Sequence, residues 1–191
     1  MPLSPQAVYN QNIDKQRIVI TGSGSSILTS IITKVLTANH RKFDQVINGE
    51  ATTQSGSQII LIEEKEPSKL IGYQHHLAIL TGSTNQPDSL QELEAFADAT
   101  PKGGTLIYPE ADSKLKAIGE KQRADIQSLS YKTISHEVKS GKIILVSSKN
   151  EKFPIQLSGD ENLQLLASAK EVLKKIGISS LQFYTSVSTI N

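Results

Sequence analysis

Three runs of apolar residues constrain the fold more than any other feature of this sequence. They lie at residues 18–20, 59–62 and 77–80, and none of them alternates with polar residues. A strand with one face in water alternates between apolar and polar side chains, whereas a strand covered on both faces does not. We therefore expect three adjacent, buried, parallel strands.

Helical periodicity between and after these runs predicts an α/β order. Apolar residues recur with helical spacing at 27–36, 89–97 and 166–176. Strands that alternate with helices favour a mostly parallel sheet with flanking helices. The segments 142–146 and 153–157 are separated by a polar turn, which predicts a small antiparallel section.

Length and composition predict one domain preceded by a short arm. The 191 residues can bury a substantial core, and 37% of them are hydrophobic and 20% charged, as is usual for a globular protein. Residues 1–16 are polar and contain Pro2 and Pro5. We expect an N-terminal arm over 1–16 and an α/β domain over 17–191.

Charge and hydropathy narrow the classes of partner. The net charge of +1 is spread along the chain and offers no basic patch for nucleic acid or an anionic membrane. No apolar stretch is long enough to span a membrane. The absence of cysteine excludes thiol chemistry and disulfides, and we expect a cytoplasmic protein. Small molecules, a protein partner or a second copy of the chain remain as partners.

A Gly/Ser-rich loop joins the first apolar run to the helical segment at 27–36. Glycines allow tight turns that aim backbone amides at an anion near a helix N-terminus. A triphosphate site also needs a loop lysine, and none lies between Lys15 and Lys34. A tight turn that favours small residues is the alternative. The candidate residues for nucleotide or anion binding are Gly22, Ser23, Gly24, Ser25 and Ser26.

Acidic and imidazole side chains near the other two runs are the remaining candidates for metal binding. Glu63, Glu64 and Glu66 follow the second run, and carboxylates at strand ends can hold a hard cation. We expect Glu63 to lie near the Gly/Ser loop, because both follow parallel strands; a solvated strand exit is the alternative. His75 and His76 open a strand, where neighbours face opposite sides, so we expect one exposed and one half-packed ring.

The order of these segments resembles the central ATP-binding domain of the Mur ligases, the amino-acid ligases of peptidoglycan precursor synthesis. Ile20–Ser23 is similar to the family's strand and T-G-T or T-G-S opening. Ile59–Glu63 is similar to the strand that ends in its magnesium-binding glutamate, and Gly159–Asn162 to the start of its nucleotide-contacting helix. The resemblance covers nearly the whole chain after the arm. It implies a P-loop-like fold, ATP and magnesium as cofactors, Glu63 as a metal ligand and Asn162 as a nucleotide contact.

Several positions depart from the family's pattern. The family's G-K-T or G-K-S is missing before the helix. Gly82 stands where the family has an asparagine, and no histidine follows in 83–88. Glu161 replaces the histidine of the nucleotide-contacting helix, and Leu165 replaces its second asparagine. The family's N-terminal UDP-sugar-binding domain and its C-terminal domain have no counterpart in these residues, so we expect no complete active site.

Three interpretations follow. The residues favour a catalytically degenerate Mur ligase-like domain, with no catalytic residue and no activity on its own. It would act as a binding or assembly module for a protein partner, a second copy, a nucleotide or a UDP-sugar precursor. The second interpretation is a subunit of an ATP-dependent UDP-N-acetylmuramate-amino acid ligase that another chain completes. The third is an unrelated α/β binding domain in which the Gly/Ser loop is only a turn.

Overall fold

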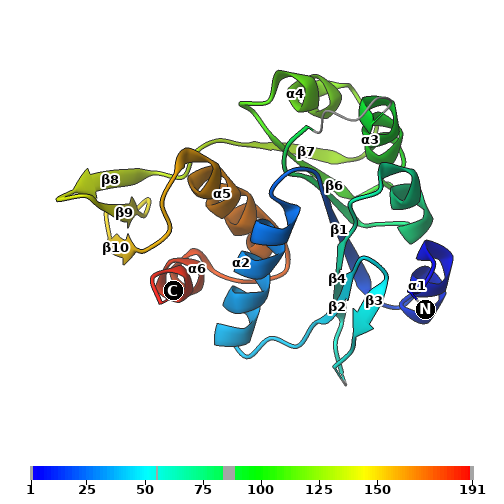
Figure 1. Cartoon of the computed structure of the whole chain (residues 1–191), viewed down its shortest axis with the longest axis horizontal. Coiled ribbons are helices and arrows are strands. Elements are labelled where there is room, and N and C mark those ends of the chain that lie inside the picture. The colour runs from blue at the N-terminus through cyan, green and yellow to red at the C-terminus, as the bar shows by residue number, and fades with distance from the viewer. Residues whose placement is uncertain (1, 55, 84–88, 190–191) are drawn as a thin grey trace. The chain divides into compact units, whose positions relative to one another are not determined.

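The computed structural model describes residues 2–54, 56–83 and 89–189. The chain divides into two units, Met1–Ser26 with Lys42–Ser130 and Ile27–Arg41 with Tyr131–Asn191. The first unit is built on a seven-stranded sheet, and the second contains a three-stranded sheet and two helices near the C-terminus (Figure 1). Within the described part of the chain, no helix has the length and apolar character that crossing a lipid bilayer requires.

The three apolar runs of the sequence form the centre of the large sheet. β1 (Gln16–Thr21) lies between β4 (Ile59–Glu63) and β5 (Leu77–Leu80), and both pairs are parallel. Every residue of β4 and β5 is buried, as are all residues of β1 after the first. The predicted adjacent, parallel, buried strands are therefore confirmed.

Four further strands extend the sheet on both sides of this centre. They are β2 (Asp44–Ile47), β3 (Glu50–Thr52), β6 (Thr105–Pro109) and β7 (Gln127–Tyr131). The strand order is β3-β2-β4-β1-β5-β6-β7. β2 runs parallel to β4 and β6 parallel to β5, whereas β3 is antiparallel to β2. The sheet is thus mostly parallel, which confirms the predicted α/β class.

Helices of the first unit contribute to the core on one face of this sheet. They are α1 (Pro5–Gln11), the 3-10 helix η1 (Pro67–Tyr73), α3 (Ser89–Asp98) and α4 (Ser113–Glu120). One cluster of buried side chains unites Val8, Tyr73, Phe96 and Leu115 of these helices with Val19 of β1. Figure 1 shows α3 and α4 beside the β6 and β7 end of the sheet.

The helix α1 falls within the segment predicted as an arm. Ser4 caps it by accepting a hydrogen bond from the amide of Ala7 at 3.2 Å. Val8 is fully buried, and the guanidinium of Arg17 lies 4.9 Å from the ring centroid of Tyr9. Residues 1–16 therefore contribute a packed helix to the first unit, and a domain boundary at residue 17 stays a prediction.

The helix after the Gly/Ser loop is α2 (Ser25–Ala38), which begins in the first unit and continues in the second. Most of its predicted apolar stripe is buried, including Leu28, Ile32 and Val35. Ile27, which the periodicity places on the same stripe, is 41% exposed. The predicted packing of this helix on the sheet stays a prediction.

The second unit contains the predicted antiparallel section. β8 (His136–Lys139), β9 (Lys142–Val146) and β10 (Lys152–Ile155) form a sheet in the order β10-β9-β8. α5 (Asp160–Lys175) and α6 (Ser180–Val187) follow, and a capping box at Ser179 begins the last helix. The predicted hairpin formed by β9 and β10 is confirmed.

His75 is buried, contrary to the expected exposed or half-packed ring. Only 1% of the residue is exposed, and its ring centroid lies 4.3 Å from that of Phe96. Nε2 lies 3.0 Å from the hydroxyl oxygen of Thr100. Burial lowers the pKa of His75 to about 3, and the positive charges of His76 and Arg17 act in the same direction. His75 lies two residues before β5, and its ring is part of the core.

We expect this imidazole to make the protein less stable in acid. An exposed histidine takes up a proton near pH 6.5, whereas folded His75 does so only near pH 3. The unfolded state binds more protons between these values, so the free energy of unfolding falls as the pH falls through this window. The slope for one group is at most about 1.4 kcal/mol per pH unit.

Urea unfolding at about pH 7.5 and about pH 5 measures this effect. His75→Phe should reduce the difference between the two pH values, because the phenyl ring does not titrate. His40→Asn is the matched control, since His40 is exposed, and it should leave the difference unchanged. An equal difference in all three proteins would show that His75 does not cause the acid sensitivity.

Candidate functional site

The Gly/Ser loop turns the chain from β1 into α2. Gly22 and Gly24 have positive φ values of 105° and 81°, which residues with a Cβ atom rarely adopt. The amide of Ser25 donates a hydrogen bond of 3.3 Å to the carbonyl of Gly22. The two glycines therefore allow a tight strand-to-helix turn that residues with a Cβ atom would adopt only with strain.

The loop is held against the end of β5. The amide and the hydroxyl of Thr81 each donate a 2.9 Å hydrogen bond to the carbonyl of Thr21. The amide of Ser23 donates a 3.2 Å bond to the carbonyl of Gly82. A Cβ atom at Gly22 would lie 2.5 Å from that carbonyl oxygen, so the two backbones touch. One amide that could face a phosphate is thus engaged within the protein.

The carboxylate of Glu63 lies beside the first residues of α2. Glu63 ends β4 and is 2% exposed. The hydroxyl of Ser26 donates to its Oε1 at 2.5 Å, and the hydroxyl of Ser25 lies 3.4 Å from the same atom. The predicted proximity of Glu63 to the loop is therefore confirmed, and both lie at the carboxyl edge of the sheet.

The neighbouring glutamates do not join Glu63. Glu64 accepts a 2.7 Å hydrogen bond from the hydroxyl of Tyr73, and burial together with this bond raises the pKa of that hydroxyl above its usual range. Glu66 forms an ion pair of 2.8 Å with Lys69. Across the described residues, no group of three acidic, histidine or cysteine side chains is arranged to hold a metal ion.

The lysine beside the loop is exposed and makes only a long contact with Glu63. Lys65 places its Nζ 4.0 Å from Oε1 of Glu63, and its side chain is 60% exposed. The loop itself contains no lysine or arginine. A negatively charged ligand would therefore meet the carboxylate of Glu63 without a fixed cation to offset it.

The residues at this edge suit the magnesium ion of a magnesium nucleotide better than its phosphates. Oxygen donors suit magnesium, and the carboxylate of Glu63 and the hydroxyls of Ser25 and Ser26 provide three of them. A reacting triphosphate needs positioned positive charge, which the loop does not supply. The loop and Glu63 therefore offer oxygen ligands to a hard cation, and the loop adds no cationic side chain of its own.

Asn162, the candidate from the nucleotide-contacting helix, lies in the first turn of α5. Its Nδ2 donates a 2.7 Å hydrogen bond to the carbonyl of Ser158. It belongs to the second unit, whereas Glu63 and residues 22–26 belong to the first. A role for Asn162 at the loop stays a prediction.

One polar contact near the loop was not predicted. Asp112 caps α4 through the amides of Lys114 and Leu115, and its Oδ2 also accepts a 2.8 Å hydrogen bond from the amide of Ser83. The capping position of Asp112 is readable from the sequence, but the contact with Ser83 joins residues that are distant along the chain. This carboxylate holds the amide of Ser83, the residue directly after Gly82.

Comparison with known proteins identifies the fold. No protein-family model matches the sequence, and no curated protein does. The structure is similar to UDP-N-acetylmuramate:L-alanyl-gamma-D-glutamyl-meso-diaminopimelate ligase from Neisseria meningitides, with a TM-score of 0.79, 13% identity, and coverage of 98% of this chain and 70% of that protein.

Two further ligases are similar over the same part of the chain. UDP-N-acetylmuramoylalanyl-D-glutamyl-2,6-diaminopimelate--D-alanyl-D-alanyl ligase from Acinetobacter baumannii has a TM-score of 0.76 and 13% identity, and the match covers 98% of this chain and 48% of the ligase. MurF ligase from Thermotoga maritima, in complex with ADP, has a TM-score of 0.72 and 12% identity over 98% of this chain and 51% of that one. The chain thus has a Mur ligase fold and spans about half the length of these two ligases.

Proposed function

We propose that this chain is a Mur ligase-like binding module that does not catalyse amide-bond formation on its own. One observation carries the proposal: the loop that follows β1 offers hydroxyls and no cationic side chain to a ligand at the N-terminus of α2, and it lies beside the buried carboxylate of Glu63. Phosphoryl transfer depends on positive charge positioned around the transferred group. A site with the opposite charge can bind through a metal ion but cannot stabilise that transition state.

The same charges favour a ligand that brings its own cation. A free phosphate near Glu63 is repelled by the buried carboxylate, whereas magnesium can bridge the carboxylate and a phosphate oxygen. The helix N-terminus and the amides of the loop add a weaker attraction for an anion. We therefore propose weak binding of a magnesium-bound nucleotide, with a protein partner, a second copy or a UDP-sugar precursor as the other classes of ligand.

A nucleotide titration with and without magnesium tests this proposal. We expect ADP to bind weakly with magnesium and not measurably without it. Glu63→Gln keeps an oxygen for the hydroxyl of Ser26 but removes the charge, so magnesium should no longer strengthen nucleotide binding. Glu66→Gln is the control, because the side chain of Glu66 is 63% exposed and points to Lys69.

Either of two results would contradict the proposal. Tight nucleotide binding without magnesium would require a cation that acts at the loop. Equal magnesium dependence in the Glu63→Gln variant and the unmodified protein would remove Glu63 from the site.

A further inference from the structure

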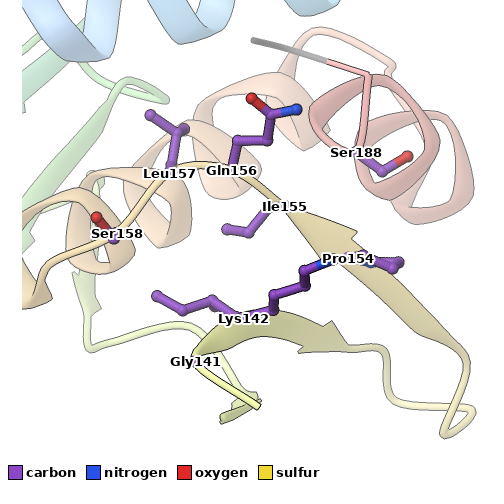
Figure 2. Close-up of a pocket in the computed structure, with 9 residues that line it drawn as sticks. Gly141, Lys142, Pro154, Ile155, Gln156, Leu157, Ser158 and Ser188 are labelled. Atoms are coloured by element: carbon purple, nitrogen blue, oxygen red, sulfur yellow. The ribbon is translucent and has the colours of Figure 1, made fainter. Parts of the chain in front are cut away.

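A cavity of about 500 Å³ lies in the second unit, and none of the loop residues discussed above lines it. It is bounded by the start of β9, the end of β10, the segment 156–158 and Ser188 at the end of α6 (Figure 2). Cavities of this size hold small molecules in other proteins. The cavity therefore has room for a ligand of that class.

The strand pairing explains why a hollow forms here. The ladder of β9 and β10 ends where Ile155 pairs with Ile143. After Ile155 the chain passes through Gln156 and Leu157 to α5 and no longer pairs with β9. Figure 2 shows this segment on one side of the cavity and β9 on the other. The cavity therefore forms where the backbone of β10 separates from β9.

The lining combines apolar and polar surface in similar amounts. Ile143, Ile155 and Leu157 supply apolar surface, and Ser158 and Ser188 supply hydroxyls. Lys142 is the one charged residue among the lining residues, and it is exposed. The lining is thus mixed, with apolar side chains beside polar groups that can orient a small organic ligand.

A second lysine increases the positive charge at this end of the cavity. Lys139 pairs directly with Lys142 across the hairpin of β8 and β9. Ser140 and Gly141 form the turn between them, with φ values of 51° and 73°, as a two-residue hairpin turn requires. Like charges opposite each other destabilise a strand pair. The tight turn therefore sets two lysines opposite each other on neighbouring strands.

In the described part of the chain, Lys139 and Lys142 have no carboxylate partner, in contrast to Lys152 of the same sheet. Lys152 of β10 forms a 2.7 Å ion pair with Glu137 of β8. Among the described residues, neither Lys139 nor Lys142 takes part in an ion pair. Asp160 follows the lining residue Ser158 closely in the sequence. It lies in the first turn of α5, where its charge complements the helix dipole. An external anion would offset the repulsion of the two lysines.

We propose that this cavity binds a small organic acid, with its apolar part against Ile143, Ile155 and Leu157 and its carboxylate at Lys142. The apolar wall provides affinity through buried surface, and the lysine selects the acid over its neutral counterpart. The hydroxyl of Ser158 can donate to the same carboxylate, whereas that of Ser188 already donates a 2.8 Å hydrogen bond to the carbonyl of Thr185. This inference is independent of the proposed function of the Gly/Ser loop.

An amide NMR titration with two matched probes tests the proposal. Naphthalene-acetate and naphthalene-ethanol share one ring system, but only the first carries a charge at neutral pH. We expect both to shift the amides of residues that line the cavity, and the acid to bind about two- to fivefold more tightly. Lys142→Ala should remove this preference, and Lys142→Glu should reverse it. Lys149→Ala, an exposed lysine on the turn between β9 and β10, is the control and should leave the preference unchanged.

A cavity-filling variant keeps the test decisive. Ser188→Trp should abolish the response of the cavity amides to both probes while the remaining amides keep their positions. Equal affinities of the acid and the alcohol, an unchanged preference in Lys142→Ala, or shifts confined to other surfaces would each overturn the proposal. The proposal would also be overturned if neither probe bound.

Discussion

Gly22→Ala should lower the free energy of unfolding by about 2 to 4 kcal/mol. Gly22 has a φ of 105°, and an added Cβ atom would lie 2.5 Å from the carbonyl oxygen and 2.9 Å from the amide nitrogen of Gly82. Both are backbone atoms at the end of β5, so a flexible side chain cannot relieve the clash. The loop would have to leave β5 and lose the bond from Ser23 to Gly82.

Gly103→Ala is the matched control for this prediction. Gly103 also has a positive φ, 76°, but an added Cβ atom meets nothing within 4 Å. The control should therefore lose only about 1 kcal/mol through the unfavourable backbone conformation. Chemical denaturation of both variants measures the two losses. Equal losses would contradict the close contact between the loop and Gly82.

Ser26→Lys should raise the affinity for magnesium ADP about five- to thirtyfold. Ser26 is exposed and lies next to Glu63, so a lysine there would place an ammonium group where the loop now has only hydroxyls. A charge-assisted contact with a phosphate is worth about 1 to 2 kcal/mol at such a partly exposed position. ATP turnover should not rise in parallel, because Gly82 and Glu161 lack the asparagine and histidine side chains that the resemblance to the Mur ligases implies.

Ser30→Lys separates the local effect from the effect of net charge. Ser30 is exposed and lies one turn further along α2, about 6 Å away along the helix axis. Calorimetric titration of the two variants with the same nucleotide compares them directly. A similar gain in both would mean that the added charge acts from a distance and that the loop does not position the phosphate.

The centre of the fold could be predicted because local pattern and tertiary environment agree there. The runs in β1, β4 and β5 are apolar throughout, and the structure buries both faces of these strands. The small hairpin of β2 and β3 was missed although it carries a strong local signal. Its turn is Asn48-Gly49, with φ values of 49° and 83°, the pair that a two-residue hairpin turn favours.

Other features depend on contacts that sequence pattern does not specify. The polar segment before β1 forms α1, and a single apolar residue, Val8, connects this helix to the core. His75 is buried because Phe96 and Thr100 provide a stacking partner and a hydrogen-bonding partner from a distant helix and loop. Neither outcome follows from helical or strand periodicity.

The candidate site was predicted in part. Parallel strands end at the same edge of a sheet, and this rule correctly brought Glu63 to the Gly/Ser loop. The contact of Gly22 with Gly82 was not predicted, because a backbone contact between two glycines leaves no chemical signature in the sequence. The expected acidic cluster is divided, because Glu64 is held by Tyr73 and Glu66 by Lys69.

An ATP hydrolysis assay on the unmodified chain with magnesium tests the central claim most directly. The loop after β1 contains no lysine or arginine, and Lys65 is 60% exposed and lies beside Glu63. We therefore predict phosphate release that does not exceed background. Magnesium-dependent turnover that survives repurification and disappears in Glu63→Gln would contradict the claim that this ligase-like domain is inactive on its own.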